Sequence, residues 1–400
     1  MTSTEQPAPA DLAAARSAAR ALGRVRVGGV QRGSGFLVAP SVLLTDQTVL
    51  STVEEAERAV VELGDPPTGY ELRPGTLFAT DPAAGYTLVA IAARSAAGPA
   101  PAAFTLAEPA DGAPGLSLAL AAVREGQERP YYDTEADAAA RSAYYTSVDR
   151  SGDPGELRAT LSALVERTHV NRPGYQPSQQ LYPWVDLHPD RLLRSIYSGA
   201  TFTAEELVRA DVRVEAARRR RWSALLAQST TTFAAQAVAV EEELLFNCEH
   251  VVPQSWFAKA EPMRGDLHHL FACEPKCNSF RGNTAYFDFA GTEGVREACG
   301  RSAAEGFEPV AGKGPVARAT LYFLLRYPGT IGDAAGELPP DRLEMLLSWH
   351  EQDPVGDYER HRNAAIEQVQ GNRNPFIDDP ALARLVDLRA AWPVTISRIA

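Results

Sequence analysis

The sequence is poor in cysteine, in basic charge and in long apolar runs, and each shortage excludes a class of protein. Four cysteines in 400 residues do not form the pattern of a disulfide-scaffold protein. A net charge of −12 excludes a protein that coats nucleic acid through a global basic field. No stretch is long enough to span a bilayer, and the Ala- and Pro-rich N-terminus has no apolar core of a secretory signal. We therefore predict a cytoplasmic protein.

The composition that remains is typical of a globular protein of more than one domain. Hydrophobic residues make up 45% of the chain and charged residues 22%, which allows a large core. At about 150 residues per domain, the length predicts two or three domains. Basic character is concentrated in the run Arg218 to Arg221, which is typical of a solvated helix face; a phosphate-tracking role is the alternative.

The N-terminal quarter is predicted to be a small all-β barrel or sandwich. Short β-branched or alternating segments are separated by Gly and Pro from about Gly23 to Val123. The predicted strands are 23–27, 35–39, 42–45, 60–62, 77–79 and 86–91. Residues Ser95 to Pro101 are predicted to be a loop and Arg124 to Asp137 a polar connector.

From about Ala138 the pattern becomes helical. Glu156–Thr168 places leucines on one face at helical spacing. Thr203 and Glu206 form a capping box that opens a helix through the arginine run. A further helix covers 340–350, and Asp353-Pro354 would open another helix that Gly371 closes.

The segment from Asn247 to Phe287 carries the residues with catalytic potential. It begins with NCEHVVPQSWF and ends with GDLHHLFACEPKCNSFRGNTAYF. We predict a strand over 246–252, a second strand near 270–272, and a helix from Glu274-Pro275 that carries Asn278 and Arg281. A Glu-His pair on the first strand and an Asn on the helix indicate a ββα-metal finger.

Hydrolysis of a phosphodiester explains each residue type in this pattern. A neutral histidine, here His250, is the natural base for deprotonating water. The charge that develops on the phosphate requires a hard cation such as Mg²⁺, for which Glu249 and Asn278 offer oxygen ligands. Neighbouring strand residues face opposite sides, so Glu249 and His250 need a twisted strand end to converge.

Residues 138–380 resemble the endonuclease I family of bacterial nucleases. The family pattern R-E-H-V-x-P-x-S-x-F, D-L-H-H-L and N-x-x-R-[GS]-N is matched here by 248–257, 266–270 and 278–283, and a C-terminal block over 349–355 and 370–378 is also similar. The resemblance implies that Glu249 and Asn278 bind the metal, that His250 is the general base, and that DNA and often RNA are cleaved with little sequence preference, leaving 5′-phosphate ends. Cys248 departs from the usual arginine, and only 28 positions separate His250 from Asn278 (278 − 250).

Several roles stay open at this point. Arg281 either clamps the scissile phosphate or forms an internal salt bridge. His268 and His269 are expected to brace the finger rather than to do chemistry, and the block GNRNPFID to tie the C-terminal helix to the core. For the four cysteines, buried free thiols are favoured over a structural zinc site or a disulfide; they are Cys248, Cys273, Cys277 and Cys299.

Residues 33–49 resemble the first barrel of trypsin-like serine proteases. Thr48 stands where the family has its histidine, Gly85 stands where the aspartate belongs, and no G-D-S-G stretch follows. A triad that lacks all three members cannot activate a nucleophile, so this region is interpreted as an inactive half-protease.

Together these features predict an α+β protein: an N-terminal β-barrel-like domain, then a mixed α/β nuclease domain with a ββα-metal finger. The predicted parts are a disordered or helical tail (1–22), the β domain (23–125), a linker (126–137), the nuclease domain (138–381) and a C-terminal extension (382–400). The predicted function is an endonuclease that depends on Mg²⁺ or another divalent cation. DNA is the predicted substrate, and RNA is a second candidate. The β domain is predicted to bind a protein partner or to restrain the site, as in a bacterial defence effector. The rival function is an inactive nucleic-acid-binding or adaptor protein.

Overall fold

The computed structural model describes residues 22–39, 41–63, 67–81, 86–92, 94–95, 98–99, 114–227, 240, 243–291, 294–332 and 336–392. The chain divides into two units, Met1–Asp111 with Val214–Leu244, and Gly112–Arg213 with Leu245–Ala400. The predicted tail, except for Leu22, and Gly85 lie outside the described residues. No helix in the described ranges is long and apolar enough to cross a membrane.

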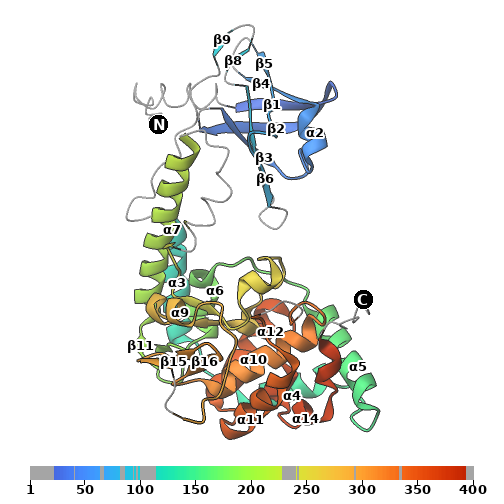
Figure 1. The fold of residues 1–400 in the computed structure, drawn as a ribbon, viewed down its shortest axis with the longest axis vertical. Helices are drawn as coiled ribbons and strands as arrows, with labels where there is room; N and C mark the ends of the chain where they lie inside the picture. Colours follow the sequence, from blue (N-terminus) through green and yellow to red (C-terminus); the bar gives the residue numbers. More distant parts are fainter. Residues whose placement is uncertain are drawn as a thin grey trace, which may run out of the picture. The chain divides into compact units, whose positions relative to one another are not determined.

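The first unit contains a curled antiparallel sheet of seven strands, drawn in blue in Figure 1. Its order is β5-β4-β1-β2-β3-β7-β6, with β1 Leu22–Val27, β2 Val30–Ala39, β3 Val42–Asp46, β4 Ala59–Leu63, β5 Thr68–Glu71, β6 Phe78–Asp81 and β7 Tyr86–Ala90. Just beyond β5 and β7, Leu72 and Ile91 form an antiparallel bridge between strands that are not neighbours in the order. The bridge curls the sheet and confirms the predicted barrel-like domain.

Alternation places one face of each strand in the barrel core. In β4 the pattern alternates, with Val61 and Leu63 buried and Val60 and Glu62 partly exposed. The structure adds short elements that the sequence did not predict. They are β5, helix α2 (Val53–Glu57), and a pair of two-residue strands, β8 (Arg94–Ser95) and β9 (Gly98–Pro99), that overlaps the predicted loop. Such elements are too short to show a hydrophobic period.

The predicted polar connector Arg124–Asp137 is wrong, because it is largely helical. Helix α3 (Pro114–Glu128) runs into it, and α4 (Thr134–Tyr144) begins inside it. The Asp133 carboxylate caps α4 by accepting bonds from the Glu135 and Ala136 amides. The polar residues that suggested a loop are helix surface and a helix cap.

The helices predicted from Glu156 onward are confirmed with one correction. Helix α5 (Pro154–Thr168) buries its leucines, and α7 (Ala204–Ala227) opens with the Thr203–Glu206 capping box, whose two bonds measure 2.7 and 3.2 Å. Gly371, at φ 90°, closes α12 (Asp357–Gln370). Asp353 does not cap α12; its carboxylate accepts from the Gly314 amide in the first turn of α10 (Lys313–Arg326).

Helix α10 is the centre of the second unit, and α10 and the helices that follow it in the chain are drawn from orange to red in Figure 1. It packs against α5, α11 (Leu343–Gln352), which follows the turn η4 (Pro340–Arg342), and α13 (Pro375–Asp378). Residues 382–392, assigned from the sequence to an extension, bury Leu382, Leu388 and Trp392 in the same core. The remaining elements are α6 (Pro177–Gln180), η1 (Leu181–Val185), β10 (Leu193–Arg194), β11 (Thr201–Phe202), β14 (Val295–Glu297), β15 (Gly300–Ala303), β16 (Gly306–Pro309), α14 (Leu382–Leu385) and η5 (Leu388–Ala391).

Candidate active site

The segment with catalytic potential folds as strand, strand and helix. Strand β12 (Cys248–His250) pairs antiparallel with β13 (Leu270–Ala272), so that Glu249 faces Phe271 in the register. Between them lie the short turns η2 (Gln254–Phe257) and η3 (Leu267–His269). Helix α9 (Pro275–Arg281) follows β13 and packs on β12. The order agrees with the prediction, although the first strand is shorter than 246–252.

The carboxylate of Glu249 is buried among polar partners. Only 2% of the residue is exposed, and its Oε1 accepts bonds from the Tyr197 hydroxyl (2.7 Å) and the Arg281 guanidinium (3.0 Å). Burial raises the pKa of Glu249 to about 7, although Arg281 and Tyr197 act in the opposite direction. A bound cation would stabilise the ionised form of this carboxyl.

The contacts of His250 differ from those of Glu249. Its ring lies 4.5 Å from that of Tyr175 and 5.5 Å from that of His269, measured between centroids. Nε2 is 2.9 Å from the carbonyl oxygen of Arg264. A carbonyl can only accept, so Nε2 carries the proton and Nδ1 keeps its lone pair. Burial, followed by repulsion from His269, lowers the pKa of His250 well below its ordinary value, so the ring is neutral.

Asn278 joins α9 to β12 through its amide. The Nδ2 group donates to the carbonyl oxygen of Cys248 at 2.9 Å, one residue before Glu249. This bond fixes which end of the amide points at the strand. The Oδ1 atom is therefore the end that can accept a hydrogen bond or bind a cation.

The Arg281 side chain is buried and bonds to groups within the protein. It is 1% exposed, and its guanidinium donates to Glu249 Oε1, to the His250 carbonyl (3.3 Å) and to the Val251 carbonyl (2.9 Å). The internal ion pair, one of the two roles left open by the sequence, is present. A contact with the scissile phosphate stays a prediction.

Two tyrosines that the sequence did not single out complete the surroundings of Glu249. Tyr197 lies 52 positions before Glu249, with no local pattern to mark it. The Tyr286 hydroxyl lies 2.7 Å from that of Tyr197 and donates to the Val251 carbonyl at 3.1 Å. Tyr286 lies three positions after Asn283, the last residue of the N-x-x-R-G-N pattern, and this proximity is the one signal that could have indicated it.

His268 and His269 brace the unit, as expected. The His269 ring bonds the Met263 carbonyl (2.6 Å) and the His268 ring bonds the Asn372 carbonyl (3.3 Å). Asp266, just before them, is fully buried and accepts bonds from Tyr322 (2.8 Å), Tyr327 (2.9 Å) and Gln370 (3.0 Å). This network holds the second strand against α10 and α12.

The C-terminal block is also structural, as expected. Arg373 is 0% exposed and pairs with Asp137 (2.8 Å), Asp378 (2.7 Å) and Glu367 (2.5 Å), while Asn374 caps α13. The block thus joins α4, α12 and α13.

The expectation of four free thiols is wrong for two of the cysteines. Cys277 and Cys299 form a disulfide, whereas Cys248 and Cys273 are buried and free. The bonded pair is 22 positions apart, in α9 and directly before β15, so that only the tertiary fold brings the sulfurs together. No motif spacing marks such a pair.

Two arginines of the run in α7 pair with acidic side chains, and a third is buried. Arg218 is buried and bonds the Leu244 carbonyl, Arg219 pairs with Glu215, and Arg221 pairs with Glu243. These contacts favour the structural interpretation of the run.

Thr48, which the sequence resemblance places at the position of the protease histidine, has a local structural role. The Thr48 hydroxyl and amide both donate to the Asp46 carboxylate, at 2.5 and 2.8 Å, in the turn after β3. A hydroxyl cannot serve as a general base near neutral pH as an imidazole does. The side chain stabilises a turn.

Comparison with known proteins identifies the family of residues 158–381. The family model described as Endonuclease I matches residues 158–381, more than half of the chain. The chain belongs to the endonuclease I family. This endonuclease I homologue is 38% identical over 162 residues to an extracellular ribonuclease of Bacillus subtilis (strain 168), covering 37% of this chain and 54% of the relative. It is 32% identical over 122 residues to an extracellular deoxyribonuclease of Aeromonas hydrophila, covering 29% of this chain and 50% of the relative.

The similarity covers only part of this chain and only part of each relative. A periplasmic deoxyribonuclease of Aeromonas hydrophila is 29% identical over 154 residues, covering 32% of this chain and 62% of the relative. The chain thus spans about half the length of the curated relatives it matches. Among solved structures, the inactive form of the Rv3671c protease covers 28% of this chain and 50% of that chain, at 20% identity and a TM-score of 0.18, which supports no conclusion.

Proposed function

We propose that this endonuclease I homologue is a divalent-metal-dependent endonuclease that hydrolyses phosphodiester bonds in DNA and RNA with little sequence preference. The proposal is supported by family membership and by relatives named as ribonucleases and deoxyribonucleases. The single observation that carries it is the pair of oriented groups on β12 and α9, the buried carboxylate of Glu249 and the fixed amide of Asn278.

The donor set fits a hard cation. A carboxylate oxygen and an amide oxygen are ligands that Mg²⁺ accepts, with its remaining positions left to water and phosphate. Glu249 and Asn278 would hold the cation, which would neutralise charge that develops on the phosphate oxygens. Arg281 and Tyr197 hold the Glu249 carboxylate in place. Burial raises the pKa of Glu249 to about 7, and a bound cation would favour the ionised form.

His250 is proposed as the general base. Its Nδ1 lone pair is preserved by the bond from Nε2 to the Arg264 carbonyl, and its low pKa keeps the ring neutral at physiological pH. The ring can therefore accept a proton from the attacking water at Nδ1. The neighbouring rings of Tyr175 and His269 limit the motion of the His250 imidazole.

One assay separates this function from the rival inactive adaptor. The purified full chain is incubated with plasmid DNA and with RNA, with Mg²⁺ or EDTA, beside His250→Ala. We expect cleavage that EDTA abolishes and that His250→Ala reduces by about 10²- to 10⁴-fold. The matched control is His188→Gln, whose ring stacks on Tyr358 outside the site and should leave the rate unchanged. No cleavage by the wild-type chain, or equal cleavage by His250→Ala, would contradict the proposal.

We also propose that the barrel binds a protein partner or restrains the nuclease unit. The test keeps the full chain, because truncation at residue 125 would cut helix α3 of the other unit. Leu43→Asp places a charge in the barrel core, where Leu43 is 0% exposed, and should change nuclease activity or partner capture. Unchanged activity with unchanged binding would refute the regulatory role.

The cellular location stays a prediction. The sequence favours the cytoplasm, whereas the Cys277–Cys299 disulfide is more typical of an oxidising compartment. Fractionation of the source cells with an antibody to the chain decides between them.

A further inference from the structure

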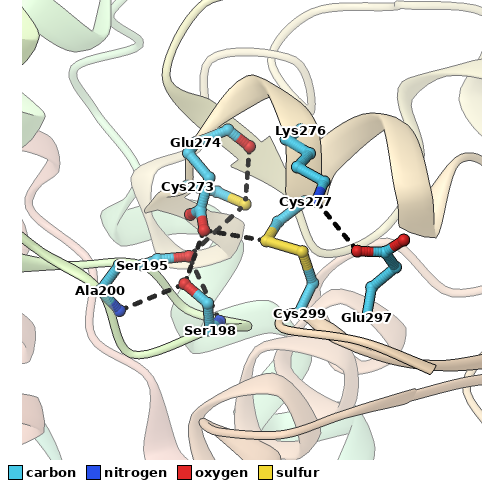
Figure 2. The surroundings of a disulfide bond; sticks show 9 residues. All are labelled: Ser195, Ser198, Ala200, Cys273, Glu274, Lys276, Cys277, Glu297 and Cys299. Atoms are coloured by element: carbon cyan, nitrogen blue, oxygen red, sulfur yellow. Dashed lines mark hydrogen bonds and ion pairs between the residues drawn. A yellow bond between two sulfur atoms is a disulfide. The ribbon is translucent and has the colours of Figure 1, made fainter.

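Three potential metal ligands gather at the start of α9, outside the proposed nuclease site. Glu274 occupies the cap position of the helix, Cys277 lies in its first turn, and Cys299 lies directly before β15. One ligand atom from each of these residues falls within 4.8 Å of the others. Figure 2 shows the disulfide between the two cysteines with the Glu274 carboxylate turned toward it.

In the part of the chain that the structure describes, one oxygen of the Glu274 carboxylate has no hydrogen-bond partner. Its Oε1 accepts a bond from the Ser198 hydroxyl at 2.6 Å and lies 2.9 Å from Cys277 Sγ. Its Oε2 is buried and has no hydrogen bond among the described residues. A buried carboxylate oxygen is normally satisfied, because an unsatisfied one retains its desolvation penalty. This atom therefore indicates a ligand that the cluster can accept.

We propose that the reduced form of this cluster binds one thiophilic divalent cation, such as zinc, through the Cys277 and Cys299 thiolates and the Glu274 carboxylate. A dithiol reductant transfers two electrons to the disulfide, which opens to two thiols while the reductant closes to its own disulfide. The cation then displaces the two thiol protons into solvent and bonds to both sulfurs. Water completes the fourth position.

The ligand chemistry separates this cluster from the proposed magnesium site. Thiolates are soft ligands that select zinc and similar cations, whereas Glu249 and Asn278 offer only oxygen. The neighbouring ammonium of Lys276 pairs with Glu297 at 2.9 Å, which offsets its repulsion of a cation. The free thiol of Cys273 is not a member of the group.

The cation would preserve a link that the disulfide makes covalently. In the oxidised chain Cys277 ties α9 to the strand β15 that follows Cys299. The same helix carries Asn278 and Arg281. A zinc ion between the same sulfurs would keep α9 attached to the sheet after reduction, so that the helix is held under both redox conditions.

The test uses Co²⁺ as a spectroscopic substitute for zinc in the full chain. Reduction with dithiothreitol should raise the count of free thiols from two to four, since two are free and two are bonded in the oxidised chain. After removal of the reductant under argon, Co²⁺ should give a thiolate-to-cobalt absorption band that saturates at one ion per chain and disappears when zinc is added. The oxidised chain should give no such band.

Variants assign the band to its ligands. Cys299→Ser should abolish it, and Glu274→Gln should weaken Co²⁺ binding at least tenfold. The matched control Cys248→Ser removes a buried thiol outside the group and should keep the band. Glu249→Gln should also keep it, so that failure of this proposal and failure of the proposed nuclease site are distinguishable.

A second readout does not depend on absorption. Zinc should raise the melting temperature of the reduced chain but not of the oxidised chain, because a ligand that binds only the reduced native state stabilises it. A reduced wild-type chain with four free thiols and native circular dichroism that shows neither a thiolate band nor a zinc-dependent melting shift would overturn the proposal. A band that persists in Cys299→Ser would do the same.

Discussion

The barrel and the strand-strand-helix unit are built on opposite kinds of core. Among the described residues of the barrel, the buried polar side chains are Thr45 and Thr87, and the rest of its core is apolar. Around β12, β13 and α9, the buried side chains include Glu249, Asp266 and Arg281. Both regions are held by burial, but only the second buries charge.

This difference shows where geometry depends on electrostatics. Burying a charge lowers the stability of the fold unless the charge is paired and hydrogen-bonded. Replacing a whole buried ion pair by hydrophobic residues often leaves the stability unchanged. The barrel keeps its curl through apolar side chains, so no buried ion pair is needed to hold its core. The charges around β12 instead fix the orientation of Glu249 and the backbone of His250, which is what a catalytic arrangement requires.

The largest effect is expected from breaking the buried ion pair. Arg281→Met leaves Glu249 without its cationic partner and should lower the free energy of unfolding by about 3–5 kcal/mol at pH 8. The loss should shrink at pH 6, since the pKa of Glu249 is about 7 and its protonated form needs no counter-charge. Urea unfolding at the two pH values measures this.

A surface ion pair of the barrel is the matched control for this experiment. Arg24 lies 3.5 Å from Glu62, and its side chain is 53% exposed. Arg24→Met should change the free energy of unfolding by less than about 1 kcal/mol. Equal losses for the two variants would break the comparison between the regions.

A smaller effect is expected at Asp266, and it depends on pH. Burial alone would raise the pKa of Asp266, but the neighbouring histidines and the bond from Gln370 lower it below its ordinary value. Because the folded pKa lies below the unfolded value of about 3.9, its stabilisation is complete above that pH and is lost on acidification. Asp266→Asn should lower stability by about 1–3 kcal/mol at pH 7 and flatten the loss of stability below about pH 4.

A barrel variant, Thr87→Val, is the control for Asp266→Asn, and melting temperatures at neutral and acidic pH measure both. The buried Thr87 hydroxyl donates to the Leu50 carbonyl at 2.6 Å and does not titrate. Thr87→Val should lower the free energy of unfolding by about 1 kcal/mol, and by the same amount at neutral and at acidic pH. A steeper acid dependence in Asp266→Asn than in the wild type would show that this carboxylate does not stabilise the fold as described.

The smallest effect is expected at Tyr197, whose hydroxyl donates to Glu249. In the proposed function the ionised form of Glu249 would bind the cation, so Mg²⁺ affinity should fall as the pH drops through about 7. Tyr197→Phe removes a bond that lowers the pKa of Glu249, so the fall should occur about one pH unit higher, since a bond to a charged group contributes about 1.5 kcal/mol. Calorimetric Mg²⁺ titrations from pH 6 to pH 9 measure this.

Tyr145→Phe controls for the loss of a buried hydroxyl. Its hydroxyl donates to Asp378 at 2.8 Å, the same chemistry away from the site. It should leave the pH dependence of Mg²⁺ binding unchanged. A shift of the same size in both variants would show that Tyr197 has no particular influence on Glu249.

Much of the fold could be predicted because its signals are local. The capping box at Thr203, the cap residue Gly371 and the proline that opens α9 each determine a helix end from one turn of sequence. The alternation in β4 and the position of β13 are visible in a few residues. Predictions failed where local polarity had two explanations, as with the Asp133 cap that was interpreted as part of a connector.

The sequence alone determined the identity and order of Glu249, His250 and Asn278, because a motif is a property of neighbouring residues. Only the tertiary structure decided that Tyr197 would bond Glu249, that Arg281 would turn inward, and that Cys277 would meet Cys299. These contacts join residues 22 to 52 positions apart. Such pairings follow from the packing of whole elements, for which no short stretch of chain carries a signal.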